Sequence, residues 1–437
     1  MARELREQVA MDPDLDLDQP SAPSIDINRL YRLWEANNWS ATAIDFSRDL
    51  VDWREILTPI QRAAAQWNYA LFLHGEEAVA RTLAPFVAAM PTEEQRVFIT
   101  TQIVDEARHH VFFSRFMREV LGGGTDMAST LEVFRPELTI GFRRVFGELD
   151  RLTDRLRRHP GNRALLAQCI TLYHLVIEGG LAHPGQQLIR GYVEDMGIMP
   201  GFAEGIAHVS RDESRHMAFG VQVLSELLAS EPAARDAVIR MLNRVLPWMI
   251  TLFYSPTLGD AAVEVFGVDM ADVYAFGLRS LETKLVRAGI DPSEVAAMVK
   301  MGIERTPREQ AERALTLLHA GIFGDVAELR IDDEILALLF ETLERVVNMR
   351  PVPHLSGAIQ WDFSNAEPWY LTVEDYRAVV RPGRASAAAV TITCQVEDWA
   401  RIAGEKLNPL WALATGRIKL RGERAALLKL PAILGTA

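Results

Sequence analysis

Cysteine is scarce in this sequence: 437 residues include only Cys169 and Cys394. Two thiols cannot build a disulfide framework, and neither has a second cysteine nearby, which excludes a thiolate zinc site and favours a reducing compartment. Positive charge is also limited, with 46 Lys and Arg against 59 Asp and Glu and a net charge of −13. A general nucleic-acid binder needs a basic surface, so we expect no nucleic-acid partner.

Long apolar runs are absent as well. No run reaches the roughly 18–20 consecutive apolar residues of a membrane span, and the best candidate, residues 245–254, is short and contains Pro247. The N-terminus lacks the apolar region of a secretory signal and is rich in Asp and Pro. We therefore expect a cytoplasmic protein without a transmembrane segment, in which residues 1–25 form a mobile leader.

The pattern of apolar residues divides the remaining sequence into two predicted domains. In residues 26–325, apolar residues recur at spacings of three and four between prolines and glycines, which predicts the long helices of a bundle. After about residue 330, strand-like alternation appears. Strands are predicted at 359–363, 369–373, 378–381, 390–394 and 417–421, with helices at 334–348, 396–404, 408–415 and 423–430. The predicted fold is mainly α, with a smaller α+β domain over 330–437.

A near-repeat carries the main chemical signal. Residues 105–109 read Asp-Glu-Ala-Arg-His and residues 212–216 read Asp-Glu-Ser-Arg-His. A Glu-x-x-His spacing puts the carboxylate and the imidazole on one helix face. Each copy is preceded by a helix with a glutamate on an apolar face, Glu76 before the first and Glu178 before the second. Buried carboxylates cost several kcal/mol unless they are compensated, and metal ions compensate them.

The sequence therefore predicts a site for two metal ions. The six predicted ligands are Glu76, Glu106, His109, Glu178, Glu213 and His216. Four carboxylates and two imidazoles suit iron or manganese better than zinc, and such a site normally activates dioxygen. For Asp212 two interpretations stay open: it accepts the second ring N–H of His109, or it is a surface charge.

These motifs resemble the ferritin-like dinuclear metal family, and most closely its ligand-binding oxidases related to the small subunit of ribonucleotide reductase. The resemblance covers about residues 26–310. It is carried by Ala-Ile-Asp-Phe-Ser-Arg-Asp at 43–49, Gly-Glu-Glu-Ala-Val at 75–79, Tyr-His-Leu-Val-Ile-Glu at 173–178 and the two repeats. It implies a ferritin-like bundle in a homodimer, with a manganese/iron or di-iron centre and a long-chain fatty acid in an apolar channel.

The resemblance also implies an ether bond between a valine and a tyrosine near the metals, which match Val79 and Tyr173. On an ideal α-helix Tyr173 lies about 140° around the axis from Glu178, so only its long side chain would approach the metals. The alternative is that both residues simply belong to the core.

A radical-generating reductase subunit is the nearest alternative class. It commonly carries a tyrosine one turn after the first histidine, where this protein has Phe113, and it needs a flexible C-terminal tail with a tyrosine. Here the C-terminus is predicted to fold, which disfavours this function.

The C-terminal domain resembles the sterol carrier protein type 2 family. The resemblance is carried by Gly-Ala-Ile-Gln-Trp-Asp-Phe at 357–363 and Gly-Arg-Ile-Lys-Leu-Arg-Gly-Glu at 416–423. It implies a tunnel for an acyl chain or another lipid, although a packed core without a cavity fits the same residues. The basic stretch from Arg417 to Lys429 favours a solvated strand face over contact with an anionic membrane.

Both domains point towards lipids, so an oxygen-activating oxidase that acts on a long-chain acyl or lipid substrate is the leading hypothesis. Its rival is a non-catalytic lipid carrier with a structural metal site.

Overall fold

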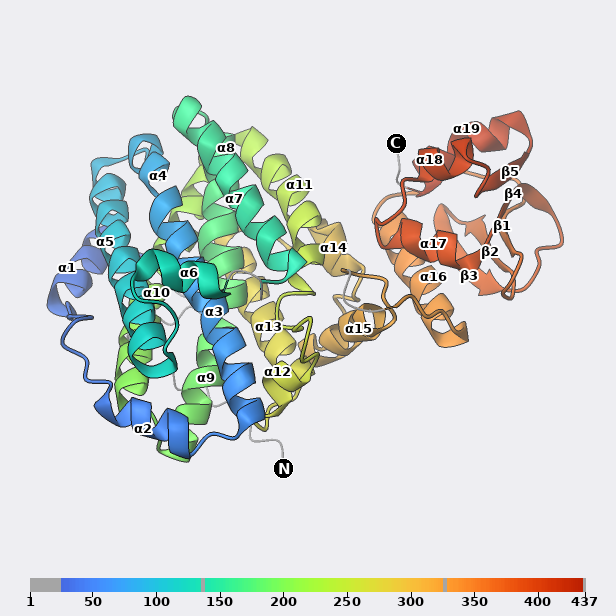
Figure 1. The fold of residues 1–437 in the computed structure, drawn as a ribbon. Helices are drawn as coiled ribbons and strands as arrows, with labels where there is room; N and C mark the ends of the chain where they lie inside the picture. The colour runs from blue at the N-terminus through green and yellow to red at the C-terminus, as the bar shows by residue number, and fades with distance from the viewer. Residues whose placement is uncertain (1–24, 135–137, 325–327, 435–437) are drawn as a thin grey trace. The chain divides into compact units, whose positions relative to one another are not determined.

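The computed structural model describes residues 25–134, 138–324 and 328–434. The predicted leader, residues 1–25, lies almost entirely outside these ranges. The protein forms two compact units, Met1–Pro292 and Ser293–Ala437; they are described separately below (Figure 1). The domain boundary expected between residues 325 and 330 lies inside the second unit.

The first unit is built from helices. Its longer elements are α1 (Ile27–Ala36), α2 (Ser47–Glu55), α3 (Pro59–Thr82), α5 (Glu93–Phe116), α7 (Ile140–Arg158), α8 (Arg163–Ile170), η3 (Thr171–Ala182), α9 (His183–Met196), α10 (Pro200–Ser230), α11 (Pro232–Met249) and α13 (Met270–Ala288). Shorter ones are α4 (Ala84–Ala89), η1 (Met117–Leu121), α6 (Met127–Phe134) and α12 (Ala261–Glu264). The prolines and glycines expected to separate helices do so, and the predicted helical bundle is confirmed.

The helices that later carry the site are fixed at their first turns. Thr58 and Thr92 each form a capping box with the glutamine three residues on, at the starts of α3 and α5. The start of α10 is held from α2, because the buried Asp49 carboxylate accepts the backbone N–H groups of Gly201 and Phe202. These contacts set where each helix begins and hence where its glutamates and histidines lie.

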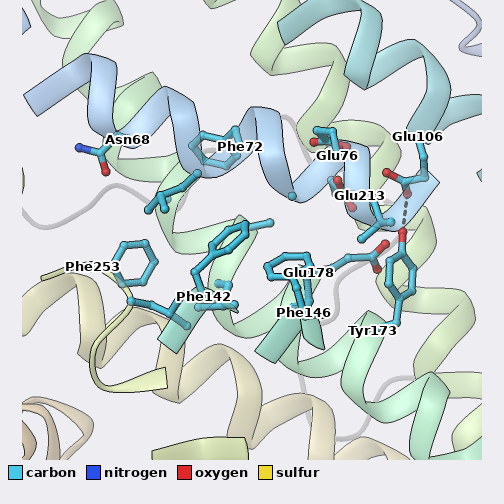
Figure 2. A pocket seen from close by; sticks show the side chains of 18 residues that line it. Asn68, Phe72, Glu76, Glu106, Phe142, Phe146, Tyr173, Glu178, Glu213 and Phe253 are labelled. Carbon is cyan, nitrogen blue, oxygen red and sulfur yellow. Dashed lines mark hydrogen bonds between the residues drawn. The ribbon is translucent and has the colours of Figure 1, made fainter. Parts of the chain in front are cut away.

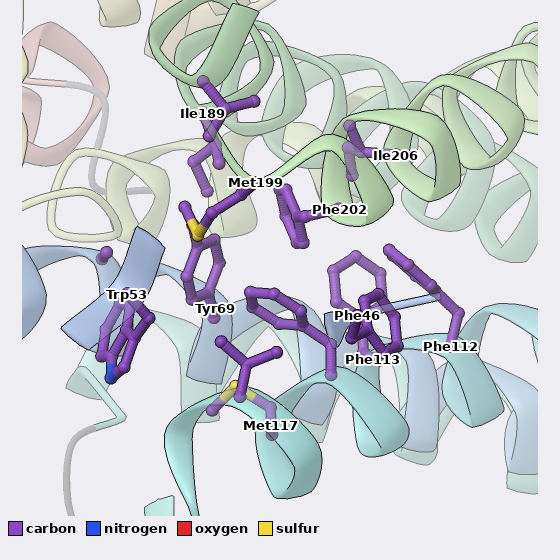
Figure 3. Close-up of a cluster of buried hydrophobic side chains, with 14 of the residues drawn as sticks. Phe46, Trp53, Tyr69, Phe112, Phe113, Met117, Ile189, Met199, Phe202 and Ile206 are labelled. Atoms are coloured by element: carbon purple, nitrogen blue, oxygen red, sulfur yellow. The ribbon is translucent and has the colours of Figure 1, made fainter. Parts of the chain in front are cut away.

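A large aromatic and aliphatic cluster packs beside the site helices. It joins residues of α2, α3, α5, α9 and α10, among them Tyr69, Phe112, Phe116 and Phe202 (Figure 3). Phe202 contacts both Phe116 and Tyr69, with ring centroids 4.5 and 4.8 Å apart. Close ring packing of this kind holds α3, α5 and α10 against one another.

The helix that carries Glu178 is a π-helix, η3, rather than an α-helix. A π-helix pairs each N–H with the carbonyl five residues earlier. Pro184 has no N–H for the carbonyl of Gly179, and the Ser280 hydroxyl of α13 donates to that carbonyl instead, at 2.7 Å. A side chain of the neighbouring helix α13 therefore replaces the backbone hydrogen bond that η3 lacks at Gly179.

One helical stretch, Arg163–Met196, is long and apolar enough by length and composition to cross a membrane. The stretch passes on its mean hydropathy and still contains no run of 18 consecutive apolar residues, because Gln168, His174 and Glu178 interrupt it. Its most apolar window is 83% buried within the protein, which is typical of a central bundle helix.

The second unit contains a five-stranded mixed sheet in the order β3-β2-β1-β4-β5. Its strands are β1 (Ala358–Phe363), β2 (Trp369–Glu374), β3 (Arg377–Pro382), β4 (Ala388–Cys394) and β5 (Lys419–Gly422). β1 and β4 run parallel and the other neighbours antiparallel. β1 lies at the centre of the sheet, and five of its six residues are buried.

Helices accompany this sheet. They are α14 (Ala296–Val299), α15 (Pro307–His319), α16 (Asp333–Val347), α17 (Val396–Ala403), α18 (Pro409–Ala414) and α19 (Arg424–Leu434). Phe340 of α16 stacks on Trp369 and contacts Trp361 and Trp399 in the core. The predicted α+β fold and all its predicted strands and helices are confirmed.

Candidate metal centre

The structure brings the six predicted ligands together inside the first unit. They come from four elements: Glu76 from α3, Glu106 and His109 from α5, Glu178 from η3, and Glu213 and His216 from α10. They form two groups of four whose ligand atoms lie within 4.8 Å of one another. One group holds Glu76, Glu106, His109 and Glu213, and the other holds Glu106, Glu178, Glu213 and His216. Glu106 and Glu213 belong to both groups.

Both imidazoles face the carboxylates through Nδ1. His109 Nδ1 lies 3.6 Å from Glu76 Oε2 and 3.7 Å from Glu213 Oε1. His216 Nδ1 lies 3.1 Å from Glu106 Oε1 and 3.5 Å from Glu178 Oε1. Two clusters of mixed oxygen and nitrogen donors therefore lie side by side.

The donor atoms are buried and unsatisfied by the protein itself. Both Nδ1 atoms, and one Oε2 atom each of Glu76, Glu178 and Glu213, have no hydrogen-bond partner within the described residues. Buried polar atoms are almost always paired, so five such atoms at one place call for a missing partner. Cations that accept oxygen and nitrogen ligands satisfy all five, so the residues present fit a pair of metal ions.

The electrostatics of the site agree with this interpretation. Burial raises the pKa of Glu76 to about 8, which the nearby His109 only partly opposes. Burial and the neighbouring Glu213 carboxylate raise the pKa of Glu178 well above its usual range. Burial acts against ionisation of Glu106 too, but the adjacent imidazoles hold the pKa of Glu106 well below its usual value. Four carboxylates at this density need positive charge to ionise together.

Each histidine is held from the opposite helix. His109 of α5 lies with Nε2 3.2 Å from Asp212 Oδ2 of α10, and His216 of α10 lies with Nε2 3.2 Å from Asp105 Oδ2 of α5. A carboxylate only accepts, so Nε2 carries the hydrogen and Nδ1 is free for a metal. Of the two interpretations left open for Asp212, the structure supports contact with His109, and Asp212 is buried rather than a surface charge.

The two aspartates are themselves held by a shell of donors. Trp34 Nε1 donates to Asp105 at 2.9 Å and Trp39 Nε1 donates to Asp212 at 2.7 Å. Buried Arg215 pairs with Asp212 and also lies 3.5 Å from Asp105. These donors fix the direction of both aspartate side chains, and the contacts with His109 and Arg215 hold the pKa of Asp212 below its usual value against the effect of burial.

Tyr173 reaches the site because of the π-helix. Residues five apart stack along such a helix, so Tyr173 lies on the same side as Glu178 rather than 140° away as on an α-helix. Its hydroxyl donates to Glu106 Oε1 at 2.6 Å and accepts from Gln102 Nε2 at 3.2 Å. Gln102 also donates to Glu178 Oε1 at 2.9 Å. Gln102 is buried beside the ligands, and sequence reasoning missed it.

An apolar pocket opens directly onto the carboxylates. Its wall includes Glu76, Glu106, Glu178 and Glu213. Figure 2 shows these groups and Tyr173 gathered at one end, while aromatic side chains line the rest. The other lining residues are Asn68, Leu71, Phe72, Gly75, Val79, Phe142, Phe146, Tyr173, Ile177, Leu181, Ala182, Gly185, Leu252 and Phe253. Val79 and Tyr173 thus share one pocket with the carboxylates.

The fold and the site define a ferritin-like protein with a buried dinuclear metal centre. Residues 24–246 match the family described as ribonucleotide reductase, small chain. This match covers more than half of the chain, and the chain belongs to this family. Residues 340–435 match the SCP-2 sterol transfer family, so an SCP-2 domain follows.

Solved structures refine this placement. Two variants of an R2-like ligand-binding oxidase with an anaerobically reconstituted Mn/Fe cofactor are 25% and 26% identical to this chain, with TM-scores of 0.52 and 0.53. Each comparison covers 60% of this chain and 93% of the other. An R2-like ligand-binding oxidase from Sulfolobus acidocaldarius shares the fold at 24% identity, with a TM-score of 0.50, over 62% of this chain and 93% of its own. Similar proteins therefore hold manganese and iron, and the clusters of this protein suit such a pair.

Asp105 is another residue that sequence reasoning missed, as it missed Trp34 and Trp39. The signal was present, because Asp105 and Asp212 occupy the same place in the two repeats. Glu77, the neighbour of Glu76 on α3, belongs to neither cluster and forms an ion pair with Arg81, with 3.5 Å between Arg81 Nε and Glu77 Oε1.

Proposed function

We propose that this protein is an oxygen-activating dinuclear oxidase that binds a long-chain fatty acid or a related lipid. The observation that carries the proposal is the continuity of the apolar pocket with the carboxylate clusters. The carboxylate of a fatty acid would bind the metals at one end of the pocket, and its acyl chain would pack against the aromatic side chains that line the rest.

The six clustered residues would hold manganese and iron or two irons, with Glu106 and Glu213 shared between the ions. Ions of this kind supply the electrons that reduce dioxygen and the oxidising power for attack on a C–H bond. The protein's own contribution is placement and exclusion of water. Phe142 and Phe146 of α7, together with Phe72 of α3, line the pocket beyond the carboxylates, where apolar side chains would exclude water.

We also propose the ether link between Val79 and Tyr173. Both residues line the pocket, and the Tyr173 hydroxyl lies 2.6 Å from Glu106 Oε1, which is placed to receive its proton. The Tyr173 O–H bond and a C–H bond of the Val79 isopropyl group break, and one C–O bond forms. The two protons and two electrons released pass to dioxygen, the oxidant of the proposed reaction.

Oxygen uptake tests the oxidase function. Protein loaded anaerobically with manganese and iron is mixed with aerated buffer, with and without a long-chain fatty acid, and oxygen and product are followed. We expect oxygen uptake only when the metals are present. We also expect the fatty acid to be oxidised or to stay bound to the protein. After exposure to air, the Val79 and Tyr173 peptides should appear joined, lighter than their sum by two hydrogen atoms.

A pocket variant separates lipid binding from metal binding. Leu181→Trp places a large ring in the pocket and leaves all six clustered residues in the sequence. We expect it to hold both metals and to lose the fatty acid. Lipid binding without any oxygen uptake in the wild-type protein would instead support the carrier function.

A further inference from the structure

The second unit exposes an unusual amount of apolar surface at α18 and α19. Leu410 and Leu428 are 75% and 74% exposed, more than any other large hydrophobic residue in the described part of the protein. On α18, Trp411 and Leu413 are exposed as well, and only Ala412 is fully buried. Single exposed leucines are common, but three large apolar residues on one six-residue helix are not.

Basic side chains accompany this apolar surface. Between α18 and the middle of α19, the sequence has five cations (Arg417, Lys419, Arg421, Arg424 and Lys429) and one acid, Glu423, a net charge of +4 in a protein of net charge −13. Arg417 forms an ion pair with Asp398, which leaves the other four as the basic groups of this segment. Lys419, Arg421 and Arg424 are exposed, and their side chains form no hydrogen bond or ion pair with other described residues, although the backbones of Lys419 and Arg421 pair with β4.

The two features are joined locally. The Arg417 guanidinium lies 5.8 Å above the Trp411 ring, and the backbone N–H of Ile418 donates to the carbonyl of Ala412, so the backbone folds back from α18 into β5. β5 is an edge strand, with Lys419 and Arg421 on one of its faces. Figure 1 draws α18, β5 and α19 at the same end of the second unit.

We propose that the surface formed by Leu410, Trp411, Leu413, Lys419 and Arg421 docks onto an anionic lipid bilayer. Tryptophan and leucine suit the boundary between headgroups and acyl chains, and arginine and lysine reach the negatively charged headgroups. A bilayer offers negative charge to this basic surface and needs no matching shape. A stable protein partner needs roughly 800 Å² and 20–30 residues on each side, whereas this surface is formed by five side chains.

This inference goes beyond the proposed oxidase, because it needs neither the metals nor the pocket of the first unit. It names the place where the SCP-2 domain would meet a membrane and therefore where lipid could enter or leave it.

Vesicle sedimentation of the full-length protein tests the proposal. The probes are vesicles of phosphatidylcholine alone and of phosphatidylcholine with phosphatidylserine, at low and at high salt. We expect binding to the anionic vesicles that weakens with salt, and little binding to the neutral ones. For Lys419→Gln with Arg421→Gln we expect about a thirty-fold loss of affinity at low salt.

Two further variants complete the design. Leu410→Ser with Trp411→Ser should reduce vesicle binding at both salt concentrations by at least about tenfold. Arg54→Gln with Arg377→Gln removes two exposed cations outside the surface and should leave binding unchanged. Thermal unfolding of every variant checks that it is folded, and all of them should keep wild-type oxygen uptake with dissolved fatty acid.

Three outcomes would overturn the proposal: no binding of the wild-type protein to anionic vesicles, equal loss in the control pair, or binding unaffected by both surface pairs. A change of oligomeric state in Leu410→Ser with Trp411→Ser, without a change in vesicle binding, would assign the surface to a second copy of the protein. If the wild-type protein binds anionic vesicles but shows no oxygen uptake, the proposed oxidase function is refuted and the membrane-docking proposal stands.

Discussion

The crossed aspartates should control how tightly the metals are held. Asp105 and Asp212 each accept the Nε2 hydrogen of a histidine from the opposite helix. Removal of such a partner typically weakens metal binding 10–100-fold, or about 1.4–2.7 kcal/mol. The side-chain oxygen of an asparagine still accepts the hydrogen bond from Nε2. For Asp105→Asn or Asp212→Asn we therefore expect metal binding to weaken about tenfold, the lower end of this range.

The same substitutions should interact in their effect on stability. Arg215 is almost fully buried and lies between the two aspartates. Either single variant leaves it one carboxylate, whereas the double variant leaves it none. An uncompensated buried charge costs about 3–5 kcal/mol. The double variant should therefore lose at least about 1 kcal/mol more unfolding free energy than the two singles together.

Two assays measure these effects. Competition with a chelator gives the metal affinity, and urea unfolding of metal-free protein gives the stability. Asp150→Asn, at an exposed position paired with Arg81, is the control and should change stability by less than about 0.5 kcal/mol. The reasoning is refuted if metal affinity is unchanged in both single variants, or if the double variant is simply additive.

Three more predictions follow from other contacts. Glu106→Ala should lose both metals in elemental analysis, because Glu106 belongs to both clusters, whereas Glu77→Ala should keep them. Gln102→Leu should lower the urea unfolding free energy by about 1–3 kcal/mol, since His174 Nε2 loses its acceptor; unchanged stability would contradict this contact. Asp49→Ala should cost about 1–2 kcal/mol by thermal unfolding through loss of the caps on Gly201 and Phe202, and an unchanged midpoint would contradict that.

The six clustered residues were accessible from the sequence because helix periodicity is local. Glu106 and His109 are three residues apart, so they share a face of any α-helix that contains them. The apolar residues on the face of Glu76 indicate that Glu76, rather than Glu77, points into the bundle. The near-repeat indicated that the two Glu-x-x-His helices, each with its preceding glutamate helix, contribute to one site. The strands of the second unit were predicted from the alternation of apolar and polar residues and from the turn residues between them.

Other features depend on contacts between distant segments. The π-helix that turns Tyr173 towards Glu106 is supported by Ser280, about 100 residues away, and no local pattern near Glu178 reports that support. Gln102 looks like an ordinary helix residue until its neighbours from η3 are known. The exposed residues of α18 were read as part of a helix, since a sequence does not say which apolar residues remain uncovered.

The sharing of Glu106 and Glu213 between the two clusters has a thermodynamic consequence. An ion held at one cluster would fix both shared carboxylates and offset their mutual repulsion, so the ligands of the other cluster would already be arranged and ionised. Loading should therefore be cooperative, with few molecules holding one ion at intermediate metal concentration. The order in which manganese and iron arrive would then matter, because the first ion shapes the position left for the second.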